Sequence, residues 1–161
     1  MRYAQIRTID VTNGEGFGMS LFVQGCHFHC KNCFNSSTWD FSKGQNFTEE
    51  TLQIILDKIN KQRQYLSFFS ILGGEPLAPE NREEVYKILS IIRQQYPTLI
   101  LNLWTGYTLE ELKDQKDDTI KQILTIIDVL IDGRYEEDKR DISLKMRGSS
   151  NQRILTHGID F

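Results

Sequence analysis

The stretch Leu21–Trp39 reads LFVQGCHFHCKNCFNSSTW and contains every cysteine of the 161-residue chain, Cys26, Cys30 and Cys33. They form a C-x3-C-x2-C array directly after the apolar run SLFVQ, which is typical of a buried strand. The segment that carries the thiols is short and polar, so we expect a loop at the end of that strand. An odd number of clustered cysteines indicates a metal or a catalytic role rather than a disulfide framework.

Outward from this stretch, apolar strands alternate with amphipathic helices. The sequence predicts helices that begin at Thr48 and Thr108, where good N-cap residues precede acidic ones. Further helices are expected over 85–96 and 119–124, and strands over 3–11, 20–24, 66–72, 99–104 and 126–131. Near-continuous apolar strands separated by helices predict a parallel sheet covered by helices.

The length of the chain limits how this sheet closes. A closed eight-stranded barrel needs about 250 residues, and this chain has 161. We therefore expect an α/β fold with one domain over residues 1–161. Its form is an open or partial (β/α) barrel with a mostly parallel sheet, and the cysteine loop follows the first barrel strand.

In such folds functional sites lie at the carboxyl ends of the parallel strands. Four segments follow predicted strands and are expected to share one rim. They are the cysteine loop, Gly73-Gly74-Glu75, Trp104-Thr105-Gly106 and Asp132-Gly133.

The composition excludes several classes of partner. A net charge of -3 and a pI of about 5.6 give nucleic acid no electrostatic footprint. The longest apolar runs are far shorter than a membrane span, and the N-terminus lacks the basic and apolar regions of a signal peptide. We expect a cytoplasmic protein with reduced thiols and with neither nucleic acid nor a membrane as partner.

Three kinds of centre are compatible with the thiol array. A structural zinc site needs four ligands, which His27 or His29 would complete, although zinc sites usually draw their ligands from two separated pairs. A redox pair Cys30–Cys33 has the C-x2-C spacing but leaves Cys26 unexplained. A 4Fe–4S cluster normally takes four cysteines, so three would leave one iron open to a substrate.

Further motifs follow the array in order up to about residue 153: FVQGCHFHCKNC with STWD at 37–40, LGGEPL at 72–77, LWTGY at 103–107, DGR at 132–134 and RGSSNQR at 147–153. The array resembles the signature of the radical S-adenosylmethionine enzymes. The ordered set of motifs resembles the glycyl-radical activating enzymes among them, and specifically the activating proteins of the anaerobic ribonucleoside-triphosphate reductase. One departure is Asn32, where many radical S-adenosylmethionine proteins carry an aromatic residue.

The resemblance implies a mechanism centred on the cysteine loop. Cys26, Cys30 and Cys33 are expected to hold three irons of a 4Fe–4S cluster, and S-adenosylmethionine would chelate the open fourth iron. An external one-electron donor would drive reductive cleavage of S-adenosylmethionine. The resulting 5′-deoxyadenosyl radical would take a hydrogen from a glycine of the reductase, which is the protein substrate and keeps a glycyl radical.

The resemblance also implies a binding site for S-adenosylmethionine. By itself, Gly73-Gly74-Glu75 is more typical of a tight turn before a helix. Together with the cysteine loop it resembles the family's site for the methionine amine, in which glycine permits close approach and Glu75 accepts from the ammonium. Thr105 and Asp132, at the next two strand ends, are expected to contact the methionine or the ribose.

The basic tail over residues 145–153 is a further candidate for binding, and two alternative functions remain open. Arg147 and Arg153 are suited to carboxylates of a substrate or partner, in a segment that otherwise has the composition of a solvated loop. The first alternative is an activating enzyme for another glycyl-radical enzyme. The second is a zinc-binding module with three cysteine ligands and one histidine, without enzymatic activity.

Overall fold

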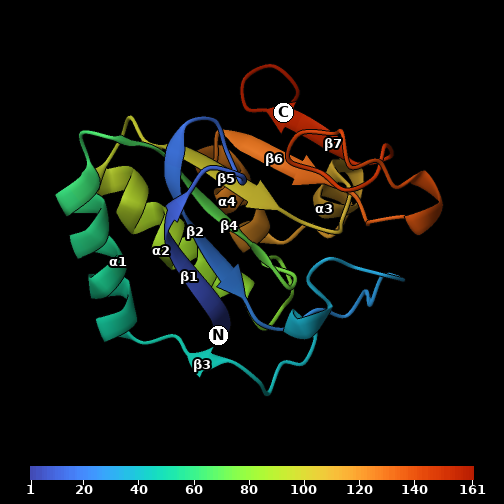
Figure 1. The fold of residues 1–161 in the computed structure, drawn as a ribbon, viewed down its shortest axis with the longest axis horizontal. Coiled ribbons are helices and arrows are strands. Elements are labelled where there is room, and N and C mark those ends of the chain that lie inside the picture. The colour runs from blue at the N-terminus through green and yellow to red at the C-terminus, as the bar shows by residue number, and fades with distance from the viewer.

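The computed structural model describes residues 1–161 and contains a seven-stranded mixed sheet, in the order β3-β1-β2-β4-β5-β6-β7 (Figure 1). The four central strands β2, β4, β5 and β6 are parallel to one another. At the two edges, β1 and β3 on one side and β7 on the other pair antiparallel, and the sheet stays open. The predicted open, mostly parallel α/β sheet is confirmed. The strands are β1 (Arg2–Asp10), β2 (Phe17–Val23), β3 (Gln45–Asn46), β4 (Leu66–Gly73), β5 (Ile100–Trp104), β6 (Val129–Asp132) and β7 (Arg153–Thr156).

The helices begin where the sequence provides caps. The Thr48 hydroxyl accepts from Thr51 N, and the Thr108 hydroxyl accepts from Glu111 N, so both predicted helix starts are confirmed. No helix is long and apolar enough to cross a lipid bilayer. The α-helices are α1 (Glu49–Gln62), α2 (Arg82–Gln95), α3 (Leu109–Asp114) and α4 (Asp118–Ile126), and short 3-10 helices cover Ser36–Thr38 and Glu137–Lys139.

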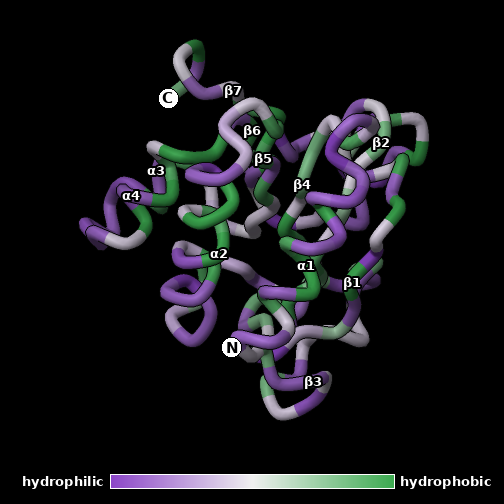
Figure 2. Tube along the Cα trace, turned by 90° about the vertical axis from the view of Figure 1, so that its left-hand side faces the viewer, coloured by the Kyte–Doolittle hydropathy of each residue, from purple (hydrophilic) through white to green (hydrophobic).

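All four α-helices cover the same face of the sheet. Their buried residues form one cluster of 25 side chains with alternate residues of the strands. In Figure 2 the central strands carry much of the hydrophobic colour, and α1 and α2 alternate between hydrophobic and hydrophilic. Right-handed crossovers between neighbouring parallel strands produce this one-sided arrangement. The strand residues in the core are Met19, Leu21, Val23, Phe69, Ile71, Leu101, Leu103, Leu130 and Leu155.

The opposite face of the sheet is the inside of the partial barrel. Strand side chains alternate between faces, so Phe22, Leu72 and Trp104 point inward near the carboxyl ends. Below them the turn between β1 and β2 packs against the sheet. Ser70 Oγ donates to the Asn13 carbonyl at 2.5 Å. This turn therefore covers the inner face below the rim and leaves the carboxyl ends of the strands accessible.

Several predicted boundaries were wrong. β2 begins at Phe17 rather than at residue 20, because Gly18 pairs with Asp10 and lies against the Phe68 ring. β6 begins at Val129 rather than at residue 126, because α4 continues to Ile126. The edge strands β3 and β7 were not predicted. β7 pairs with β6 along the sheet edge, so part of the supposed tail is a strand.

Candidate functional site

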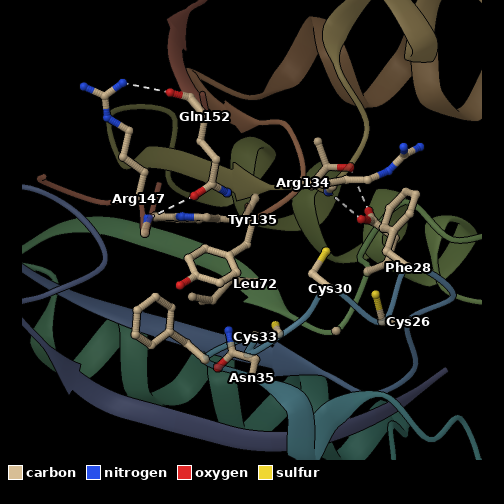
Figure 3. Close-up of a pocket in the computed structure, with 18 of the residues that line it drawn as sticks. Cys26, Phe28, Cys30, Cys33, Asn35, Leu72, Arg134, Tyr135, Arg147 and Gln152 are labelled. Carbon is tan, nitrogen blue, oxygen red and sulfur yellow. Dashed lines mark hydrogen bonds between the residues drawn. The ribbon is translucent and has the colours of Figure 1, made fainter. Parts of the chain in front are cut away.

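A cavity of about 590 Å³ lies at the carboxyl ends of the parallel strands (Figure 3). Its volume is within the range of small-molecule sites, about 300–1,000 Å³. Every residue predicted to bind the cluster or the cofactor lines this cavity except Asp132. All four segments of the expected rim reach the cavity, since Gly133 lines it although Asp132 does not. The predicted residues in the lining are Cys26, Cys30, Cys33, Gly73, Gly74, Glu75 and Thr105.

The cysteine loop is fixed at both ends. Gly25 N donates to the Thr38 carbonyl at 2.7 Å, and Cys26 N donates to the Trp39 carbonyl at 3.0 Å. Gly25 has φ +98°, and a Cβ there would lie 2.0 Å from the Phe41 ring, so this position requires glycine. The three thiols are partly buried, and none is in a disulfide. The loop thus presents all three sulfur side chains to one cavity.

The two histidines of the loop have other contacts. His27 Nε2 lies 2.9 Å from Glu80 Oε1, and the His27 ring packs on Phe41. The His29 ring stacks on Trp39 with 4.6 Å between centroids. Neither histidine lines the cavity that the three thiols share, and no three histidine, cysteine or acidic side chains are gathered as a single metal ion requires. This geometry gives no support to a zinc site with a histidine ligand.

The Gly73-Gly74-Glu75 segment packs directly on the start of the cysteine loop. Glu75 N donates to the Gly25 carbonyl at 2.7 Å, and Gly74 N donates to the Val23 carbonyl at 2.9 Å. A Cβ on Gly74 would lie 2.4 Å from the Gly25 carbonyl oxygen. Glycine at position 74 is therefore required by contact between two backbone segments, a reason that the sequence did not reveal.

The Glu75 carboxylate is buried, with 2% of the residue exposed, and all its contacts are hydrogen-bond donors. Oε1 accepts from Leu77 N and Thr105 Oγ1, and Oε2 accepts from Gly106 N at 2.7 Å. Burial raises the pKa of this carboxyl to about 7, although the three hydrogen bonds oppose the rise. Glu75 thus links the segment after β4 to the segment after β5 and adds an acidic group to the cavity wall.

Asp132 is placed differently from the prediction. It is fully buried, accepts from Leu109 N at 2.7 Å, and pairs with the Arg153 guanidinium at 2.5 Å. Arg153 also pairs with Glu110. The carboxylates that Arg153 meets are therefore within this chain, and Asp132 joins β6, β7 and α3 instead of lining the cavity.

Sequence reasoning missed most of the residues that complete the cavity wall. The 20 residues between β6 and β7, residues 133–152, fold over the cavity. Tyr135 and Ile142 from this loop line it, together with Arg147, which the sequence had already singled out. The Arg134 guanidinium lies 4.5 Å from the centre of the Phe28 ring. The DGR and RGSSNQR motifs marked this segment, but no local pattern predicted how it folds.

Comparison with known proteins identifies the family. The family model described as "4Fe-4S single cluster domain" matches residues 12–155. A relative from Pasteurella multocida, named anaerobic ribonucleoside-triphosphate reductase-activating protein, is 42% identical over 154 residues, which is 96% of each chain. The chain belongs to this family of activating proteins. Relatives with the same name from Escherichia coli K12 and from phage T4 are 39% and 38% identical and cover 94% and 98% of this chain, or 96% and 95% of their own lengths.

The site fits the single 4Fe–4S cluster that describes the family. Thiolates are the ligands that such clusters take, and all three thiols of this activating-protein family member line one cavity. Burial raises the pKa of the Cys26 thiol to about 11 and also raises the pKa of Cys30. Because cluster ligands are thiolates, binding of iron by these thiols would release their protons.

Proposed function

We propose that this protein activates an anaerobic ribonucleoside-triphosphate reductase by producing a glycyl radical on it, as a cytoplasmic enzyme of one domain. The observation that carries the proposal is the cavity shared by Cys26, Cys30, Cys33 and the Gly73-Gly74-Glu75 segment. It occurs in a chain about 40% identical, over almost its whole length, to proteins named as activators of that reductase.

The three cysteines are the ligands we assign to the 4Fe–4S cluster, and they leave one iron for S-adenosylmethionine. When bound, the cluster and S-adenosylmethionine would together supply the radical chemistry that removes a hydrogen from a glycine of the reductase. The protein's own part is to bind both groups, orient them and exclude water. The reducing electron comes from an external one-electron donor.

The segment after β4 is suited to an ammonium group. Gly73 and Gly74 add no side chains at the cavity wall, and Glu75 is an acidic group beside it. A positive group near Glu75 would favour the carboxylate over the neutral acid, opposing the effect of burial. We assign the methionine amine of S-adenosylmethionine to this segment, with Thr105 holding Glu75 in place through its hydroxyl.

Aromatic side chains pack around the thiols and would help to exclude water once the cofactors are bound. The Phe28 ring packs edge-on against Tyr107, with 4.8 Å between centroids, and lies beneath Arg134. Phe22 and Leu72 line the inner wall. A reactive radical needs such a shielded site, because exclusion of water prevents side reactions.

The proposal is tested by reconstituting the cluster without oxygen. With a reductant and S-adenosylmethionine, the wild-type protein should release 5′-deoxyadenosine, and with the reductase it should produce a glycyl radical detectable by electron paramagnetic resonance. Cys30→Ala should lose the cluster absorbance and the product. His29→Ala is the matched control in the same loop and should keep both.

Two results would contradict the proposal. Tightly bound zinc without acid-labile sulfide, lost in His29→Ala, would favour the zinc module. Release of 5′-deoxyadenosine without a radical on the reductase, but with one on another glycyl-radical enzyme, would assign a different protein substrate.

A further inference from the structure

The loop between β6 and β7 forms the cavity wall opposite the second half of the cysteine loop. In Figure 3 Arg147 and Gln152 lie above Tyr135, across the pocket from Cys33 and Asn35. This loop has little regular structure, only the 3-10 turn Glu137–Lys139 and one isolated bridge. Its shape therefore depends on specific side-chain contacts rather than on sheet or helix hydrogen bonds.

The Gln152 side chain makes most of these contacts at the base of the loop. Its Oε1 accepts from Gly148 N at 2.9 Å and from Ser149 N at 3.2 Å. Its Nε2 donates to the Gly133 carbonyl at 3.0 Å, which ties the two ends of the loop together. The Gln152 backbone carbonyl also accepts from Arg147 Nη1 at 2.8 Å. One residue thus holds both the beginning and the end of the wall.

The segment that Gln152 holds lies against the cysteine loop. A Cβ on Gly148 would lie 2.6 Å from the Phe34 ring and 3.1 Å from Tyr135. Phe34 follows Cys33, and its ring packs edge-on against Tyr135 with 5.3 Å between centroids. A displacement of Gly148 would therefore change the width of the cavity at its edge, between Phe34 and Tyr135.

The edge of the cavity, where this wall meets the cysteine loop, also carries exposed apolar side chains. Phe34 is 62% exposed and Ile142 is 83% exposed, and both line the cavity. The residues assigned to the cluster and to S-adenosylmethionine are deeper, on the strand ends and the cysteine loop. Exposed apolar groups at the edge of a site are suited to contact with a protein.

We propose that Gln152 is a positioning residue: by holding Gly148 and Ser149 against Phe34 and Tyr135, it sets the wall that receives the glycine-bearing segment of the reductase. The inference rests on the proposed function for the identity of that segment. Gln152 itself does not act on the cofactors. Its loss should therefore separate cleavage of S-adenosylmethionine from transfer of the radical to the protein substrate.

The test compares Gln152→Ala and Gln152→Glu with Gln53→Ala, a control on the exposed side of α1, where Gln53 contacts only Asp57. In metal-free Gln152→Ala, the Gly148 and Ser149 amides should exchange hydrogen at least about tenfold faster, the factor for about 1.4 kcal/mol. Gln152→Glu keeps an acceptor oxygen for both amides but loses the donation from Nε2 to Gly133, so its amides should exchange more slowly than those of Gln152→Ala and faster than those of wild type.

The reconstituted proteins test the separation. With dithionite and without reductase, all three variants should form 5′-deoxyadenosine at the wild-type rate. With reductase, the number of glycyl radicals per 5′-deoxyadenosine should fall by roughly tenfold to a hundredfold in Gln152→Ala, because small errors in position have large effects on rate. Gln152→Glu should restore most of this yield.

Three outcomes would overturn the inference: wild-type exchange of Gly148 and Ser149 in Gln152→Ala, a wild-type radical yield, or an equal loss of 5′-deoxyadenosine without reductase. The last result would mean that Gln152 only stabilises the fold. Absence of 5′-deoxyadenosine from the wild-type protein would instead contradict the proposed function, and the exchange measurement would still decide whether Gln152 holds the wall.

Discussion

Substitution of Gly74 by alanine tests why the glycine segment is needed. Gly74 has no left-handed φ, so alanine adds no backbone strain there. Its Cβ would lie 2.4 Å from the oxygen and 2.9 Å from the carbonyl carbon of Gly25. Both are backbone atoms in a segment whose ends are hydrogen-bonded, so neither moves without cost. The variant must therefore separate the segment after β4 from the cysteine loop.

The expected loss of stability has two parts. Overpacking in a well-packed region costs about 1–3 kcal/mol. Separation of the two segments also weakens the 2.7 Å hydrogen bond from Glu75 N to the Gly25 carbonyl, which contributes about 1 kcal/mol. The free energy of unfolding of the metal-free protein should fall by about 3 kcal/mol. For a chain of this size, Tm should then fall by roughly 6–12 °C.

Thermal and urea unfolding of the metal-free protein measure this change. Gly158→Ala is the matched control, because nothing lies within 4 Å of a Cβ added at that position. Only the positive φ of +78° adds strain there, which costs about 1 kcal/mol. A Gly74→Ala protein no less stable than Gly158→Ala would refute the packing argument. If such a protein also lost affinity for S-adenosylmethionine, glycine would be required for the ligand alone.

Two further predictions concern buried carboxyl groups, measured by urea unfolding of the metal-free protein. Burial alone would raise the pKa of Asp10, but hydrogen bonds from Ser20, Thr12 and Asn13 lower it from 3.8 to about 2. The ionised Asp10 carboxylate therefore stabilises the fold above pH 3.8, and this stabilisation is lost as the pH falls through about 2. Asp10→Asn should lower the free energy of unfolding by about 2 kcal/mol at pH 7 and reduce the dependence of that free energy on pH in acid. A variant whose free energy of unfolding depends on acidic pH as in the wild type would contradict this. For Glu75, burial raises the pKa from 4.5 to about 7, so stability is greatest below pH 4.5 and falls by roughly 3 kcal/mol as the pH rises through 7. Glu75→Gln should remove this fall, and a variant with the wild-type slope would show that Glu75 is not its source.

The main elements were predictable because their signals are local. Thr48 and Thr108 cap helices through residues three positions later, and the parallel strands are apolar runs of ordinary length. The convergence of the strand ends followed from the general geometry of α/β sheets. These signals alone predict that the cysteines, the glycine segment and Thr105 share one rim.

The remaining features depend on contacts between distant segments. Asp132 is at a strand end, as predicted, but its carboxylate pairs with Arg153, 21 residues away. A sequence does not show whether a strand-end carboxylate faces the rim or a neighbouring strand. Likewise, the motif around Gln152 was visible, but its hydrogen bonds to Gly148 and Gly133 are defined only once the loop has folded.

The cavity of this protein is closed by loops and not by a complete barrel. The antiparallel edge strands β1 and β7 end the parallel array, so no further strand can complete the wall. Two loops complete it instead, one packed on Gly74 and the other held by Gln152. Neither loop belongs to the 25-residue core, so the wall between Phe34 and Tyr135 is built independently of helix packing. Such independence suits the proposed entry of a segment of the reductase, whereas a closed barrel would have to break strand pairing to provide it.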